Sequence, residues 1–144
     1  MRNPVIIAVD FDGTVIPEGL FPDGSHHNGL YHAVTVLRNW NVKGYDIVLN
    51  TCREGLSLHN AVRWFTLHDI KLSAVNASPR SWLWQHEMNV LTLSRKVFAN
   101  IYIDDRGIGV PLDDEGLLDW CKINEMVTGL VNKMSKGDSA DTSN

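Results

Sequence analysis

Cysteines and long apolar runs are scarce in this chain. Only two cysteines, Cys52 and Cys121, occur among 144 residues. Two thiols are too few for a disulfide framework, and no cysteine–histidine spacing indicates a zinc site. No stretch reaches the roughly 18 apolar residues of a membrane-spanning helix, and the first residues lack a signal-peptide pattern. We therefore expect a soluble, cytoplasmic protein with reduced thiols and no membrane partner.

Basic residues are also too few to suggest a polyanionic partner. The chain has 13 lysines and arginines against 17 aspartates and glutamates, a formal net charge of -4. This balance provides no overall positive field for nucleic acid, which makes nucleic acid an unfavourable partner. The hydrophobic content of 44% is ordinary for a globular protein, and the length fits one domain with a single core.

The apolar pattern alternates between strand-like and helix-like segments. Short β-branched runs predict buried strands, and apolar residues three and four apart predict helices. This alternation predicts an α/β fold, a three-layer, doubly wound, Rossmann-like parallel sheet with helices on both faces. Residues 135–144 lack aromatic and large apolar side chains, so we expect a disordered tail after a domain of residues 1–134. The predicted strands are residues 4–10, 45–49, 72–75 and 97–103, and the predicted helices lie near 30–40, 58–65 and 115–134.

The segment Asp-Phe-Asp-Gly-Thr at 10–14 directly follows the first predicted strand. Residues two apart in an extended segment point the same way, so Asp10 and Asp12 should share one crevice at the carboxyl end of this strand. Open α/β sheets bind ligands there, and two adjacent carboxylates call for a cation. A calcium loop is excluded, because its twelfth position is Phe21 and not glutamate. A plain turn with Asx hydrogen bonds is the alternative.

Three further polar sites stand at the ends or entrances of predicted strands. Thr51 follows the second strand, Lys96 precedes the fourth, and the Asp-Asp pair at 104–105 ends it. Together with the 10–14 segment they resemble, in order, the four motifs of the haloacid dehalogenase superfamily, which consists mostly of phosphatases. The resemblance covers roughly residues 4 to 110. The gaps between motifs are too short for a folded cap domain, so the chain resembles a capless member.

The resemblance implies a magnesium-dependent phosphomonoester hydrolase that works through an aspartyl-phosphate. Asp10 would attack phosphorus, while Asp12 would protonate the leaving oxygen and later deprotonate water. Thr51 and Lys96 would neutralise the oxygens of the transferring group. A magnesium ion would offset the repulsion between the nucleophile and the phosphate. The implied metal ligands are Asp10, Asp12 (through its backbone carbonyl), Asp104 and Asp105, and which of the last two binds directly stays open.

Two residues near these motifs are candidates for substrate binding. Gly13 allows a close backbone approach, so its N–H can hold a phosphate oxygen. Arg53 follows Thr51 by two positions and can clamp a substrate anion with two hydrogen bonds. The alternative for Arg53 is a surface arginine paired with Glu54. Thr51 and Glu54 also fit a Thr-x-x-Glu capping box.

Other candidates carry weaker signals. Lys96 has two alternatives, a solvated lysine or replacement by its neighbour Arg95. Cysteine-dependent phosphatase chemistry is not supported, because Leu58 occupies the position six after Cys52 where an arginine is needed. We expect Cys52 to be a small buried residue. A loose histidine group fits a solvated helix entrance better than a metal site; its members are His26, His27 and His32.

The phosphorylated substrate is not identified by the sequence. The loop at 17–24 and the segment with Trp82 and Trp84 are candidates for selecting the leaving group, although plain packing is favoured for the tryptophans. A capless site is suited to bulky substrates or to cover by a partner subunit, so a homo-oligomer that covers the site is one expected arrangement. The alternative functions are a non-catalytic, phosphometabolite-binding or regulatory domain and a phosphotransferase.

Overall fold

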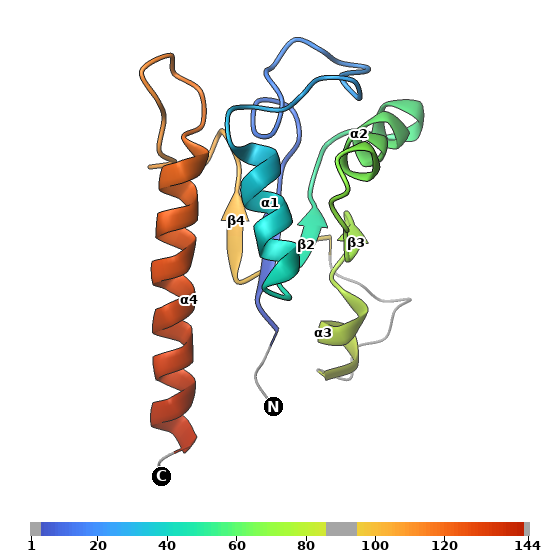
Figure 1. Ribbon diagram of the computed structural model, residues 1–144. Coiled ribbons are helices and arrows are strands. Elements are labelled where there is room, and N and C mark those ends of the chain that lie inside the picture. The colour runs from blue at the N-terminus through green and yellow to red at the C-terminus, as the bar shows by residue number, and fades with distance from the viewer. Residues whose placement is uncertain (1–3, 86–94, 143–144) are drawn as a thin grey trace.

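The protein is built on a four-stranded sheet in which all neighbouring strands are parallel, in the order β3-β2-β1-β4. Figure 1 shows the computed structural model, which describes residues 4–85 and 95–142. The strands are β1 (Ile6–Val9), β2 (Asp46–Leu49), β3 (Ala74–Val75) and β4 (Ile101–Ile103). The helices are α1 (Ala33–Val42), α2 (Gly55–Leu67), α3 (Arg80–Gln85) and α4 (Trp120–Thr142). The predicted α/β fold with a parallel sheet is confirmed.

Strand β1 occupies the centre of the sheet. Ile7 lies opposite Ile47 of β2 on one side and Ile101 of β4 on the other. All four residues of β1 are buried, as expected for a central parallel strand covered on both faces. Because the strands are parallel, the carboxyl ends of β1, β2 and β4 meet at one edge of the sheet. Asp10, Thr51 and Asp104 follow these three strands in the sequence, so they lie at this edge.

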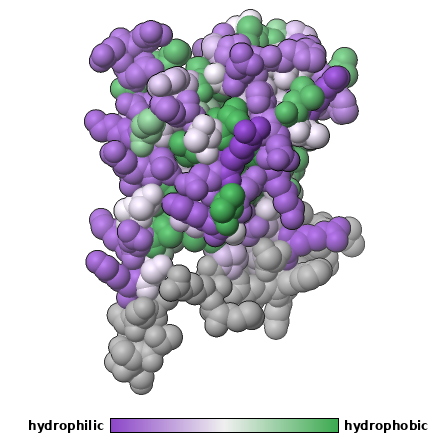
Figure 2. Space-filling model, viewed as in Figure 1, coloured by the Kyte–Doolittle hydropathy of each residue, from purple (hydrophilic) through white to green (hydrophobic). Residues whose placement is uncertain are grey.

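The three longer helices, α1, α2 and α4, pack on one face of the sheet, whereas the other face is packed mainly by the segment before β4, so the predicted helices on both faces are reduced there to the short α3. The larger core lies under α1, α2 and α4, and Trp40, Trp64 and Trp120 are almost fully buried in it. A smaller core on the other face contains Val48, and Trp82 of α3 packs against it. In the view of Figure 2 the coloured surface is mostly hydrophilic with scattered apolar residues, so the described residues form no broad apolar patch on this side.

Strand β4 begins later than the apolar pattern predicts. The expected strand at 97–103 is a strand only from Ile101 onward. The Tyr102 hydroxyl donates to the Val97 carbonyl at 2.6 Å and accepts from the Ala99 N–H at 3.2 Å, which folds this segment over the smaller core. The Trp82 ring stacks on Phe98 there, with centroids 4.5 Å apart, which confirms packing as its role. The side chain of Trp84 lies outside the described part.

Helix α4 begins later and ends later than predicted. The Asp113 carboxylate accepts the backbone N–H groups of Glu115 and Leu117, at 2.9 and 3.0 Å. Such side chain–backbone bonds compete with helix formation, so α4 begins at Trp120 and not near Glu115. It then continues to Thr142 through residues for which the composition predicted disorder, since each added residue gains a hydrogen bond once a helix is nucleated. Neither α4 nor another helix in the described ranges is long and apolar enough to cross a membrane.

Candidate active site

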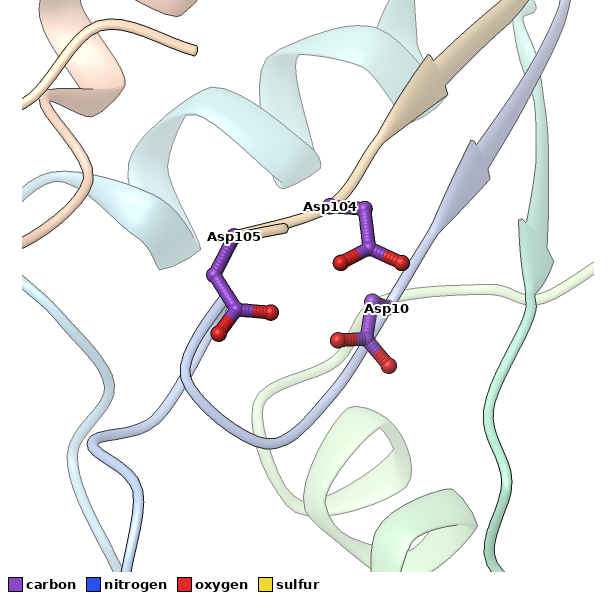
Figure 3. Close-up of side chains that lie close together, drawn as sticks. All are labelled: Asp10, Asp104 and Asp105. Atoms are coloured by element: carbon purple, nitrogen blue, oxygen red, sulfur yellow. The ribbon is translucent and has the colours of Figure 1, made fainter. Parts of the chain in front are cut away.

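Three carboxylates meet at the carboxyl edge of the sheet (Figure 3). Asp10 follows β1, and Asp104 and Asp105 follow its neighbour β4. One oxygen atom of each side chain lies within 4.8 Å of the other two, and all three residues are half-buried. Hard divalent cations such as Mg²⁺ bind oxygen ligands, usually one or two carboxylates together with water and substrate phosphate. The donor set is therefore chemically suited to the magnesium ion that the sequence predicts.

The surroundings of Asp10 disfavour its negative charge. The pKa of the Asp10 carboxyl is raised from 3.8 to about 7, chiefly by burial and also by the neighbouring Asp104 and Asp105 carboxyls, against a backbone hydrogen bond at Phe11 that lowers it. A cation bound by the same oxygens would favour the ionised form. Protonation of Asp10 and cation binding therefore compete at neutral pH.

The Thr14 hydroxyl connects the two strand ends that carry the acids. Thr14 is fully buried, and its hydroxyl accepts the Asp105 N–H at 3.1 Å. The same oxygen lies 3.3 Å from Asp10 Oδ2 and 3.4 Å from Asp105 Oδ1, so its single hydrogen can be donated to either carboxylate. The Thr14 carbonyl accepts the indole N–H of Trp120 at 2.9 Å. Sequence reasoning assigned Thr14 no role, although its place at the end of the first motif was the signal.

Gly13 leaves room for one of these acids. Its φ of +76° lies in the left-handed region, and a Cβ atom there would stand 2.5 Å from Asp105 Oδ2 and 2.9 Å from the Glu18 side chain. A side chain at position 13 would therefore displace Asp105 as well as strain the backbone. The close approach predicted for Gly13 is present, and the approaching group is Asp105. The role of the Gly13 N–H in phosphate binding stays a prediction.

The Asp12 carboxylate is bound by Arg53. Asp12 Oδ2 accepts Nε–H at 2.8 Å and Asp12 Oδ1 accepts an Nη2–H at 2.7 Å, the paired geometry of a guanidinium–carboxylate fork. Both residues line the same cavity as Asp10, so the predicted shared crevice is present. We predicted that Arg53 would bind a substrate anion with two hydrogen bonds. In the structure, these two hydrogen bonds are formed with the Asp12 carboxylate.

Arg53 is 3% exposed, so the alternative of a surface arginine paired with Glu54 is wrong. The position of Arg53 between the loop at 17–24 and α2 provides backbone acceptors for its remaining N–H groups. Nη1 donates to the Pro22 and Ser57 carbonyls, each at 3.0 Å, and Nη2 donates to the Asp23 carbonyl at 2.7 Å. All five N–H donors of the guanidinium are thus used inside the protein.

Thr51 stands at the end of β2, beside the cavity. Its hydroxyl oxygen accepts the Arg53 N–H at 3.2 Å, and its own N–H donates to Asn76 Oδ1 at 2.8 Å. The capping-box alternative is wrong, because α2 begins at Gly55 and its N-cap is Glu54, without a side-chain cap. The Thr51 hydroxyl therefore retains its hydrogen for donation to a ligand.

Lys96 is not brought into the same cavity. Its side chain is exposed, and the ammonium nitrogen lies 5.4 Å from the centre of the Tyr102 ring. Its catalytic role stays a prediction.

One member of the predicted histidine group, His27, forms hydrogen bonds within the protein. His27 Nδ1 accepts the Gly29 N–H at 2.9 Å, and the His27 carbonyl accepts the Trp64 indole N–H at 2.8 Å. Within the described residues, the group close enough to share a metal ion consists of the three aspartates and includes no histidine.

An open cavity of about 480 Å³ lies beside the acids. Phe21 is 64% exposed at its margin, and Cys52 is exposed as well, so the expectation of a buried Cys52 is wrong. A larger cavity of about 700 Å³ lies at the opposite edge of the sheet, but its lining contains no acid. The acid-lined cavity is therefore the candidate site. Its lining residues are Asp10, Asp12, Glu18, Phe21, Thr51, Cys52, Arg53, Asp104, Asp105 and Arg106.

Comparison with known proteins identifies one solved relative. No family model matches the chain, and no curated protein matches it. The chain is similar to the solved structure of a conserved protein coded by a locus from Bacteroides thetaiotaomicron, with 30% sequence identity. The match covers 88% of this chain and 92% of that one, with a TM-score of 0.68. The chain therefore belongs to the same family as this conserved protein from Bacteroides thetaiotaomicron.

Proposed function

We propose that the protein is a magnesium-dependent phosphomonoester hydrolase, a capless member of the haloacid dehalogenase superfamily. The observation that carries this proposal is the meeting of Asp10, Asp104 and Asp105 at the carboxyl edge of a parallel sheet. Asp12 of the first motif and Thr51 of the second line the cavity beside them, whereas Lys96 of the third motif does not. This set provides a nucleophile, a proton donor and a hydroxyl for the phosphate oxygens around one open space.

Asp10, Asp104 and Asp105 are the residues that would hold the magnesium ion. When bound, the ion supplies positive charge that favours ionised Asp10 and offsets its repulsion from the phosphate dianion. The raised pKa of Asp10, about 7, means that much of this carboxyl holds a proton at neutral pH without a cation. The nucleophilic form of Asp10 therefore depends on the occupation of this site.

The reaction proceeds in two displacements at phosphorus. The Asp10 carboxylate attacks phosphorus while the bond to the leaving oxygen breaks, and Asp12 gives that oxygen a proton. Asp12 then takes a proton from water as the water oxygen attacks the phosphorus of the aspartyl-phosphate. Inorganic phosphate leaves and Asp10 returns as a carboxylate. The Thr51 hydroxyl donates to a phosphate oxygen in both steps.

Three side chains at the margin of the cavity, two of them from the loop at 17–24, are candidates for contact with the leaving group. The cavity is open, so a leaving group larger than the phosphate can extend past its margin. Phe21 presents an exposed ring there, while Glu18 and Arg106 form an exposed ion pair of 3.6 Å at the same margin. These three side chains are the first candidates for choosing among phosphomonoesters.

The test is phosphate release from a panel of aryl, sugar and nucleoside phosphomonoesters, with magnesium and with a chelator. We expect turnover of at least one ester that needs the metal and is lost in Asp10→Asn. Asp69→Asn is a matched control, because Asp69 is an aspartate in the turn after α2, away from the acid-lined cavity. Turnover that survives chelation or Asp10→Asn would contradict the mechanism. A phosphorylated alcohol as product would indicate a phosphotransferase, and tight binding without turnover would indicate a binding domain.

A further inference from the structure

We infer that Arg53 is a positioning residue that holds the Asp12 carboxylate and the loop at 20–24 in one fixed relation. Its partners come from three separate parts of the chain. They are the Asp12 side chain after β1, the Pro22 and Asp23 carbonyls of the loop, and the Ser57 carbonyl in the first turn of α2. The catalytic consequence of this role rests on the proposed function.

Arg53 is also packed between the core and the cavity. Its guanidinium carbon lies 4.7 Å from the centre of the Phe11 ring, which is fully buried, and 5.4 Å from the centre of the exposed Phe21 ring. The Pro22 carbonyl accepts from a second donor besides Arg53, Asn60 Nδ2 of α2, at 3.0 Å. The loop is therefore fastened to the core through the same group that binds Asp12.

The hydrogen bonds of Arg53 decide how this residue can act. Its five donors have five acceptors within the protein, so none is directed at a ligand. Its effect on a reaction must pass through Asp12, whose two oxygens it holds in a fixed plane. Each of these oxygens keeps a second lone pair, so the proton can still be carried to the leaving oxygen. A lysine at position 53 would keep the charge but lose the planar fork.

This role predicts an effect that depends on the leaving group. A poor leaving group, such as the alkoxide of an alkyl phosphate, needs a proton from Asp12 as its bond to phosphorus breaks. The nitrophenolate of p-nitrophenyl phosphate leaves readily without that proton. General acid catalysis contributes about 10²- to 10⁴-fold. Arg53→Lys should therefore lower kcat/KM, which reports the step in which the leaving oxygen departs, at least about tenfold more for an alkyl phosphate than for p-nitrophenyl phosphate.

The kinetic arm compares kcat/KM for these two esters in wild type, Arg53→Lys and Arg63→Lys. Arg63 is an exposed arginine on α2, so its variant should leave both values unchanged. A larger loss for the alkyl ester in Arg53→Lys supports the inference. Equal losses for both esters would show that Arg53 only stabilises the fold, and they would overturn it.

The second arm uses amide hydrogen exchange and needs no activity. The N–H groups of Asp23 in the loop, and of Ser25 and His27 just after it, donate to acceptors within the loop (Leu20 O, Asp23 Oδ1 and Gly24 O), at 3.0 Å each. Asp12→Asn weakens the fork but removes no donor or acceptor from the loop itself, so it should speed exchange at these three amides, as should Arg53→Lys. Unchanged loop exchange in Asp12→Asn would overturn the inference, even if Arg53→Lys does not fold. The proposed function and the role of Arg53 can fail separately. If Asp12→Asn speeds loop exchange but the wild-type protein hydrolyses no ester, the structural link between Asp12 and the loop is supported and the proposed function is rejected.

Discussion

Asp12 Oδ1 and Arg53 Nη2 lie 2.7 Å apart, although the two residues are separated by 41 positions in the sequence. The pair joins the turn after β1 to the turn after β2, two strands that are neighbours in the sheet. Asp12 is the proton donor of the proposed reaction, so its orientation is set by a residue that follows another strand. Because the Arg53 side chain is buried, this pair holds the proposed proton donor in place more firmly than an exposed ion pair would.

Removal of Arg53 should destabilise the protein strongly. Arg53→Met leaves the Asp12 carboxylate without its partner, and three carbonyls lose a donor. The Asp12 side chain is 29% exposed, so water offsets part of the loss. We expect the free energy of unfolding to fall by about 2 to 4 kcal/mol, measured by urea denaturation, compared with less than about 0.5 kcal/mol for Arg63→Met. A loss as small as that of Arg63→Met would contradict the buried pair.

The stability of the metal-free protein should depend on the protonation of Asp10. Its pKa is about 7 in the folded protein and 3.8 in the ordinary carboxyl, so the folded state binds the proton more tightly. The contribution of Asp10 to the free energy of unfolding is therefore fully present below about pH 4 and is lost as the pH rises to about 7. Asp10→Asn removes this pH dependence. The free energy of unfolding of the variant, relative to that of wild type, should therefore increase between about pH 4 and pH 7. Urea denaturation from pH 4 to 8 measures the difference, and a flat difference would be evidence against the raised pKa.

Magnesium should stabilise the folded protein through the three acids. A ligand that binds only the folded state adds RT ln(1 + [L]/Kd), about 2.7 kcal/mol at about a hundredfold excess over Kd. Thermal unfolding with and without magnesium should therefore show a rise in Tm at pH 8. The rise should disappear when Asp104 and Asp105 are both changed to Asn, and it should persist in Asp114→Asn, which changes an exposed aspartate in the loop before α4. A magnesium-induced rise that persists in the double variant would place the cation elsewhere.

Gly13→Ala should be more damaging than a comparable glycine change elsewhere. Gly109 has a φ of +80°, close to the +76° of Gly13, but a Cβ atom on Gly109 would point into open space, with no atom of a non-neighbouring residue within 4 Å. Both variants carry the backbone cost of an alanine in the left-handed region, about 1 to 3 kcal/mol. Only Gly13→Ala should also displace Asp105 and weaken the magnesium-dependent rise in Tm. Equal effects of the two variants on that rise would show that Asp105 does not need the space.

The strands and the acids could be predicted from the sequence because they depend on local patterns. β-branched runs mark buried strands, and parallel strands bring their carboxyl ends together, so Asp10 and the pair at 104–105 were expected at one edge. Thr51 was expected there for the same reason. The structure confirms the sheet and places these residues around one cavity.

The role of Arg53 could not be predicted in the same way, because its partners lie far away in the sequence. A spacing of two after Thr51 indicates that the side chain can reach the crevice, but not which acceptor it finds there. The acceptors in the loop became available only when the chain folded back to place Pro22 and Asp23 over position 53. The start of α4 was missed for a local reason, since the Asp113 side chain competes for the backbone.

The most direct test of the proposed function is chemical trapping of the aspartyl-phosphate. Borohydride reduces an acyl phosphate to an alcohol, which would convert a phosphorylated aspartate into homoserine. The protein is mixed with magnesium and an ester that it turns over, quenched with borohydride and digested, and its peptides are analysed by mass spectrometry. We expect homoserine at position 10, formed only when ester and metal are both present. Turnover without modification at position 10, or with modification at another aspartate, would contradict it.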